Sequence, residues 1–168
     1  TLTVRQSCAP TPRQPVKEPF FIPLTVGLLD RNGRELPLQL GPADPPASAK
    51  VLRVTAAEQE FTFINVPEEP VPALLRGFSA PVKLRMDYRR DELMFLMSHD
   101  SDGFVRWEAA QQLGLQVISD GIAARAAGLP VTVDPLLVTA YGSVLEGSLR
   151  NPAIDKAMVA NLLLLPSE

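Results

Sequence analysis

The uneven distribution of proline constrains the fold of this chain more than any other sequence feature. The chain of 168 residues contains 17 prolines, of which thirteen precede Ser98 and four follow it. Proline lacks a backbone N–H and fixes φ, so closely spaced prolines prevent long helices and favour short strands and turns. The sequence therefore predicts a β domain over residues 1–90 and an α-helical segment over residues 91–168.

Alternating apolar residues indicate strands in the proline-rich part. Ile22, Leu24, Val26 and Leu28 occupy alternate positions, which is the period of a strand with one face against a core. Similar patterns predict about seven strands at the spacing typical of sandwiches. We therefore expect an immunoglobulin-like β-sandwich with strands near residues 2–7, 20–28, 36–40, 51–54, 60–66, 73–78 and 82–88.

The remaining part has the spacing of amphipathic helices. Asp91 and Glu92 precede a short apolar run and favour a short helix there, because acidic side chains stabilise a helix N-terminus. Asp102 is suited to cap a long helix, in which Gly114 and Gly121 would let a neighbouring element approach closely. The expected buried stripe of this long helix consists of Phe104, Trp107, Gln111, Leu115, Ile118 and Ile122.

Two further helices are expected to follow through short links. One opens at Asp134-Pro135 and the other at Asn151-Pro152, since a polar N-cap followed by proline is typical of a helix start. Three successive amphipathic helices indicate the beginning of a helical solenoid domain. The predicted inward residues are Leu137, Ala140, Tyr141 and Val144 in the first of these two helices, and Ile154, Ala157, Met158, Leu162 and Leu165 in the second.

Composition excludes several classes of function. The chain has one cysteine, Cys8, and one histidine, His99, which excludes an internal disulfide, a cysteine-based zinc site and a His-Glu-x-x-His motif. The net charge of −3 argues against a nucleic-acid partner, and no apolar run approaches the roughly 20 residues that span a membrane. The chain has neither an initiator methionine nor a signal peptide, which favours a cytoplasmic piece of a longer protein.

No residue of the sequence stands out as catalytic, cofactor-binding or metal-binding. His99 lies beside Asp100 and Asp102, but a capping or surface role is expected for this cluster rather than general base catalysis. The same cluster departs from a calcium loop, because position twelve of that loop would be Ala109. Cys8 has no histidine nearby in the sequence and is interpreted as a structural or incidental thiol.

A basic stripe and a tryptophan are the remaining candidates. Trp107 is expected to pack in the core or between domains rather than to stack on a ligand. The basic stripe could meet an acidic partner, although a solvated strand face is its expected role. Its residues are Lys83, Arg85, Arg89 and Arg90.

Four segments resemble a known enzyme family in the same order along the chain. Residues 71–82 (VPALLRGFSAPV) and 102–111 (DGFVRWEAAQ) are the two longest, and residues 59–63 (QEFTF) and 19–23 (PFFIP) are shorter. Together they resemble bacterial aminopeptidase N, a family of zinc-dependent alanyl aminopeptidases of the gluzincin type. The resemblance implies a four-domain enzyme, of which this chain would be the third domain, a β-sandwich, and the first helices of the fourth.

The resemblance implies that this part of the enzyme carries no chemistry. The family's zinc ligands and general base lie in His-Glu-x-x-His and a downstream Glu, and Gly-Ala-Met-Glu-Asn recognises the substrate amine. Neither motif occurs in this sequence. Zinc is therefore implied for the parent enzyme, and no cofactor for this chain. The chain is expected to be a non-catalytic spacer between the catalytic domain and the helical cap of an enzyme that removes N-terminal residues from peptides.

Several expectations about partners follow. The upstream catalytic domain and the downstream helical domain of the same polypeptide would flank the chain, and peptides would be substrates of the parent. A solenoid cut at Glu168 would expose Met158, Leu162 and Leu165, so the chain is expected to self-associate through its last helix. The alternative is a stand-alone immunoglobulin-like binding module, which the absence of disulfides and of a signal peptide disfavours.

Overall fold

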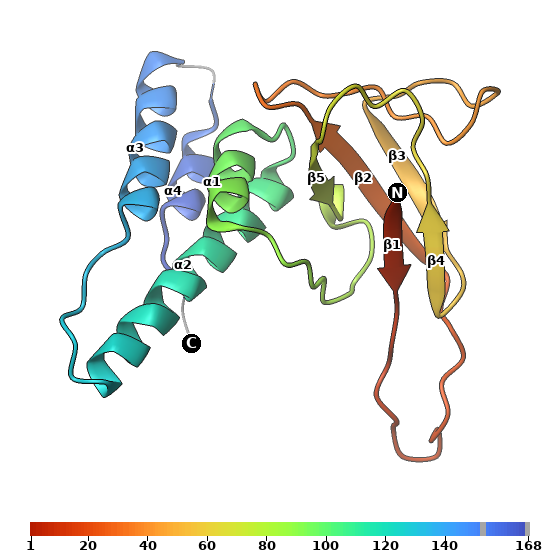
Figure 1. Cartoon of the computed structure of the whole chain (residues 1–168), viewed down its shortest axis with the longest axis horizontal. Helices are drawn as coiled ribbons and strands as arrows, with labels where there is room; N and C mark the ends of the chain where they lie inside the picture. The colour runs from red at the N-terminus through yellow and green to blue at the C-terminus, as the bar shows by residue number, and fades with distance from the viewer. Residues whose placement is uncertain (152–153, 167–168) are drawn as a thin grey trace. The chain divides into compact units, whose positions relative to one another are not determined.

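A computed structural model describes residues 1–151 and 154–166 of the chain (Figure 1). They form two compact units, Thr1–Lys83 and Leu84–Glu168. The first unit contains the strands and is called the strand unit below, and the second contains the four α-helices and is called the helical unit. The predicted order, strands followed by helices, is confirmed.

The strand unit is built around β2 (Ile22–Leu29). This strand pairs antiparallel with β3 (Ala49–Val54) on one side and with β5 (Val71–Leu74) on the other. A second, two-stranded sheet joins β1 (Leu2–Arg5) to β4 (Glu58–Phe61), with Leu2 opposite Phe61. As the central strand of its sheet, β2 has its backbone groups paired on both edges.

The core of the strand unit lies on β2 and its neighbours. Leu24, Val26 and Leu28 alternate along β2 and are buried, as the period-2 pattern predicts. Leu29 is also fully buried, so both faces of the end of this strand are covered. Buried side chains from other segments complete the core, and they include Leu38, Leu52, Val54, Ala73 and Leu74.

The described residues contain five strands rather than about seven. Residues 36–40 were expected to form a strand, but Leu38 makes only an isolated bridge to Ala47, because Pro37 lacks the N–H that a ladder needs. Residues 82–88 are also not a strand. There Val82 N donates to the Ala80 carbonyl at 2.8 Å and Tyr88 N to the Met86 carbonyl at 2.9 Å, so the backbone turns locally instead of pairing.

The helical unit begins with α1 (Arg90–His99) and α2 (Gly103–Ala126). The short helix expected after residue 90 is confirmed, and so is Asp102 as the cap of the long helix. The Asp102 carboxylate accepts a hydrogen bond from Val105 N at 2.9 Å. Acidic side chains at this position satisfy backbone donors that have no partner inside the helix.

Two helices complete this unit, α3 (Pro135–Arg150) and α4 (Lys156–Leu162). Asp134 caps α3 as predicted, through a 2.8 Å hydrogen bond from Leu136 N. The predicted start of the last helix at Asn151 is wrong, because Asn151 ends α3 and Asp155 caps α4. Pro152, the other half of that predicted start, lies outside the described residues.

The stripe predicted to be buried on α2 is wrong for most of its residues. Leu115 is 52% exposed, Ile118 38% and Ile122 66%. The buried side of α2 carries smaller side chains, which let α1 pack closely against it. Gly114 confirms the expected close approach, because a Cβ there would lie 2.8 Å from Cδ of Pro166. The buried residues of α2 are Val105, Ala109, Ala110, Leu113 and Gly114.

The inward residues predicted for α3 and α4 are partly confirmed. Ala140 and Val144 of α3 are buried, and Leu162 of α4 is fully buried. Leu165, by contrast, is 56% exposed. Met158 packs over Gly103, where an added Cβ would lie 2.5 Å from the Met158 Cε. Of the apolar face that was expected to be open, Leu162 is therefore covered and Leu165 is not, and self-association through this face stays a prediction.

Candidate functional site

The segment 71–82 forms a turn around a buried arginine. Arg76 is only 7% exposed, and its Nη1 lies 2.8 Å from Oε1 of Glu35. Gly27 of β2 lies directly beneath this guanidinium, because a Cβ at Gly27 would be 2.3 Å from Arg76 Cζ. Burying a guanidinium requires a paired carboxylate. Arg76 thus holds the turn in place through an ion pair with Glu35 and through close packing on Gly27 of β2.

The backbone of this turn is strained. Leu75 has φ of 61°, Gly77 of 63° and Phe78 of 50°. For leucine and phenylalanine the left-handed region is costly. The turn is held by Thr25 N, which donates to Ser79 Oγ at 2.9 Å. The segment was predicted to be strand, turn and strand, and the structure has the first strand and the turn without the second strand.

The His99 cluster has the capping role that the sequence favoured. His99 is exposed, its Nδ1 lies 3.0 Å from the Phe95 carbonyl, and its ring stacks on Phe95. Asp100 is buried and accepts from Asp102 N at 2.6 Å. These contacts organise the start of α2. Arg106 also supports this corner, because its Nε donates to the Met97 carbonyl at 2.9 Å and burial lowers its pKa.

The four basic residues do not form a stripe on one strand. Lys83 and Arg85 are exposed in a segment without strand structure. Arg89 pairs with Asp91 at 3.2 Å and begins α1. Arg90 binds both Asp120 of α2 and Asp134 at the start of α3, and these two carboxylates raise its pKa. Arg90 therefore connects α1 to α2 and to the start of α3 through ion pairs within the helical unit.

Cys8 and Trp107 are both accessible. Cys8 is an exposed free cysteine. Trp107 is 37% exposed beside Phe104, with the two ring centroids 6.1 Å apart, so a core position is wrong and packing between domains stays a prediction. Across residues 1–151 and 154–166, no three His, Cys, Asp or Glu side chains are grouped so that they could hold a metal ion.

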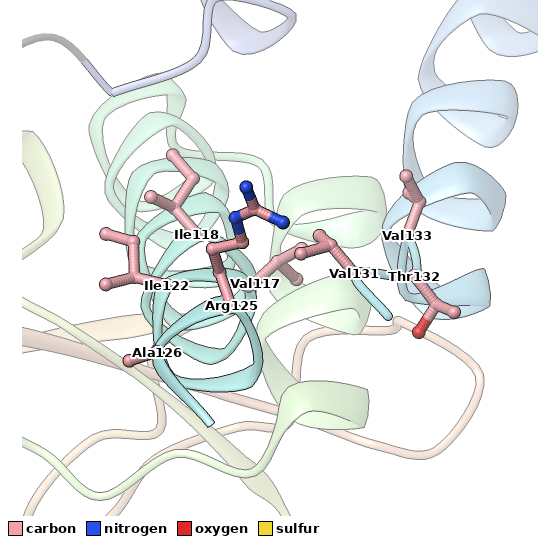
Figure 2. Close-up of a pocket in the computed structure, with 9 residues that line it drawn as sticks. Val117, Ile118, Ile122, Arg125, Ala126, Val131, Thr132 and Val133 are labelled. Atoms are coloured by element: carbon pink, nitrogen blue, oxygen red, sulfur yellow. The ribbon is translucent and has the colours of Figure 1, made fainter. Parts of the chain in front are cut away.

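An apolar groove in the helical unit was not predicted. It has a volume of about 590 Å³ and lies between the second half of α2 and the segment that leads to α3. Figure 2 shows Val117 on the side of α2 nearest Val131, Ile118 and Ile122 on the opposite edge of the helix, and Arg125 between the two sides. The sequence signal was the apolar stripe of α2 that contains Ile118 and Ile122, which had been assigned to the core.

Close packing and exposure shape this groove. A Cβ at Gly121 would lie 3.4 Å from Cγ1 of Val131, so the absence of a side chain lets the connecting segment approach α2. Val131 is 57% exposed and Val133 is 64% exposed. Of the described residues that line the groove, Arg125 alone carries a charge. No helix among the described residues is long and apolar enough to cross a membrane.

Two adjacent family models match the chain. Residues 1–87 match the domain of unknown function DUF3458, described as an immunoglobulin-like fold, and residues 90–168 match DUF3458_C, described as ARM repeats. The first match covers just over half of the chain. The predicted fold class, an immunoglobulin-like sandwich followed by a helical solenoid domain, is confirmed.

Similar proteins include several aminopeptidases. Aminopeptidase N of Escherichia coli is 42% identical and that of Haemophilus influenzae 36% identical, each over 99% of this chain. The chain spans only 18% of the length of either relative. The crystal structure of Legionella pneumophila aminopeptidase A in complex with aspartic acid matches with a TM-score of 0.67 and 34% identity. That match covers 87% of this chain and 15% of the other. The resemblance stated from the four sequence segments is confirmed.

Proposed function

Because the chain belongs to the DUF3458 family and is similar to aminopeptidase N along nearly its whole length, we propose that it is a non-catalytic segment of a longer zinc aminopeptidase. In this proposal it links an upstream catalytic domain to the rest of a helical domain, and the parent enzyme removes N-terminal residues from peptides. The observation that carries the proposal is 42% identity over 99% of the chain within 18% of the relative.

The local geometry supports a structural role. The two longest segments that resemble the family are a turn fastened by Arg76 and a helix start capped by Asp102. Both are held by hydrogen bonds from the backbone, and the first also by an ion pair. We propose that these contacts make the chain a rigid spacer that sets the distance between the catalytic domain and the helical cap, and thereby limits access to small peptides. Zinc and the reacting groups would come from the catalytic domain.

The proposed compartment is the cytoplasm. The exposed thiol of Cys8 supports it, since cysteines in oxidising compartments are commonly paired. No nucleic-acid or membrane partner is proposed, in keeping with a net charge of −3.

The first experiment determines the size and the metal content of the native polypeptide. Peptides from residues 77–83 should occur in a polypeptide several times larger than 18.3 kDa, together with stoichiometric zinc and hydrolysis of an alanyl anilide. The isolated chain should show neither zinc nor turnover. A native polypeptide of 18.3 kDa without activity would instead favour the stand-alone binding module.

A second experiment tests the spacer role. Two residues, Gly and Ser, are inserted after Asp87, which is exposed and precedes α1. The matched control is the same insertion after Gly41, which lies in an irregular loop and where an added Cβ would meet nothing within 4 Å. In the active parent enzyme, the first insertion should change kcat/KM for short peptides and the control should leave it unchanged. Equal kinetics for both insertions would contradict the spacer role.

A further inference from the structure

The outer face of α2 is an apolar feature that the proposed spacer role leaves unused. Its side chains project from α2 away from the small residues that pack on α1. Soluble proteins rarely expose contiguous apolar patches of more than a few hundred Å² unless the patch binds something. The exposed residues that line or adjoin the groove are Leu115, Ile118, Ile122, Val131 and Val133.

The fold description indicates what kind of element covers such a face. The helical unit matches an ARM-repeat family over residues 90–168. In such arrays each repeat buries its apolar face against the neighbouring repeat. Inside the unit, α1, α3 and α4 already pack on α2, and they leave the half of α2 around Ile118 and Ile122 exposed. A neighbouring repeat packed on this half of α2 would bury it.

The groove has the shape and charge that suit a helix. Apolar side chains from α2 form one wall and the extended segment 131–133 forms the other, which suits side chains spaced at i, i+3 and i+7. Arg125 is exposed at this site and makes no ion pair with a described residue. A partner helix with a carboxylate at the matching position would pair with it at low desolvation cost.

We propose that the groove between α2 and residues 131–133 binds an amphipathic α-helix, with a carboxylate facing Arg125, from the neighbouring repeat of the same longer polypeptide. This inference rests on the proposed function, which places the chain within a longer enzyme. The relatives are long enough to contain such a repeat, since the chain spans only 18% of their length. It differs from the sequence-based expectation in its location, since the open face belongs to α2 and not to α4.

The test compares the isolated chain with the native polypeptide by hydrogen exchange and thermal unfolding. In the native polypeptide, amides of residues 117–133 should exchange roughly tenfold more slowly or better than in the isolated chain. Ile122→Asp should lower the Tm of the native polypeptide and leave that of the isolated chain nearly unchanged. The control is Leu149→Asp, which makes the same change at an 84% exposed position of α3 outside the groove. It should have little effect in either polypeptide.

Several outcomes would overturn the inference. Equal exchange of residues 117–133 in both polypeptides would show that nothing covers the groove. A dimer of the isolated chain that Ile122→Asp dissociates, without added protection in the native polypeptide, would identify a second copy as the occupant. A native polypeptide of 18.3 kDa would contradict the proposed function. A long, zinc-containing enzyme in which the groove is uncovered would contradict only the inference about the groove.

Discussion

The strand unit and the helical unit differ in what sets the ends of their secondary-structure elements. In the strand unit, Leu2 pairs opposite Phe61 and Glu35 binds Arg76. In the helical unit, Asp102 and Asp134 each cap a helix through a backbone N–H two or three residues away. The strand unit therefore depends on distant segments meeting in register, while each helix of the other unit is delimited by its own sequence.

The units also differ in how completely they bury their central element. The end of β2 is covered on both faces, with Leu28 and Leu29 buried on successive positions. The long helix α2 buries Leu113 on one side and exposes Leu115 and Ile122 on another. The end of β2 is thus enclosed on both faces, whereas the second half of α2 has one exposed apolar face. Each of the following predictions tests one side of this contrast.

The largest expected effect concerns the two faces of α2. Leu113→Ala should destabilise the helical unit by about 2–5 kcal/mol, because it removes a fully buried side chain and leaves a cavity. Leu115→Ala, two residues away and half-exposed, should lower the free energy of unfolding by less than about 1 kcal/mol. Urea unfolding followed by circular dichroism measures both. A larger effect at Leu115 would restore the stripe that the sequence pattern suggested.

The next effect tests the fastening of the strained turn in the strand unit. Gly27→Ala should destabilise this unit by about 1–3 kcal/mol, because the new methyl group would displace the buried guanidinium of Arg76. The control is Gly41→Ala, where nothing lies within 4 Å of the added Cβ. Hydrogen exchange of the Val26 amide reports this unit separately from the helices. Similar exchange in both variants would mean that Arg76 moves aside without cost.

A smaller effect of opposite sign is expected on α3. The hydroxyl of Tyr141 is buried and has no hydrogen-bond partner among the described residues, and this burial raises its pKa. An unsatisfied polar group is unfavourable, so Tyr141→Phe should leave the helical unit unchanged or stabilise it by up to about 1 kcal/mol. Thermal unfolding measures this change. Clear destabilisation would show that the hydroxyl has a partner.

The smallest effect is the pH dependence of the helical unit. The pKa of Asp134 is lowered first by the hydrogen bond from Leu136 N and also by Arg90. Its contribution to stability is therefore complete above its ordinary pKa of roughly 3.9 and is lost as the pH falls through the lower folded value. The difference in Tm between the wild type and Asp134→Asn should shrink below about pH 4. A difference that stays constant to pH 2 would contradict this role.

Local signals made most of the helical unit predictable. The N-caps Asp102 and Asp134 were read correctly, because the capping contact spans two or three residues. The start of the last helix was misplaced, since Asn151 and Asp155 are both plausible caps and the choice depends on where α3 ends. The faces of α2 were also misassigned. Hydrophobicity alone ranks Ile118 and Ile122 above Ala109 and Ala110, but close helix packing selects the smaller residues.

Distant contacts limited the prediction of the strand unit and of its turn. The alternation along β2 was sufficient to locate it, yet the same alternation at residues 82–88 produced no strand because no partner edge pairs with it. The left-handed conformation of Leu75 and Phe78 has no local signal. It depends on the buried Arg76 and on Glu35, which lies 41 residues earlier in the sequence.

The long connection between β1 and β2 affects how the strand unit would respond to a cut in its backbone. Its tip is an exposed bridge between Thr11 and Gln14, with Arg13 at a positive φ. Cleavage by trypsin after Arg13 would turn β1 into a separate peptide. Pairing of β1 with β4 would then be an association between two molecules, and its extent would depend on dilution. The pairing of β1 with β4, which is now intramolecular, would then be described by a dissociation constant.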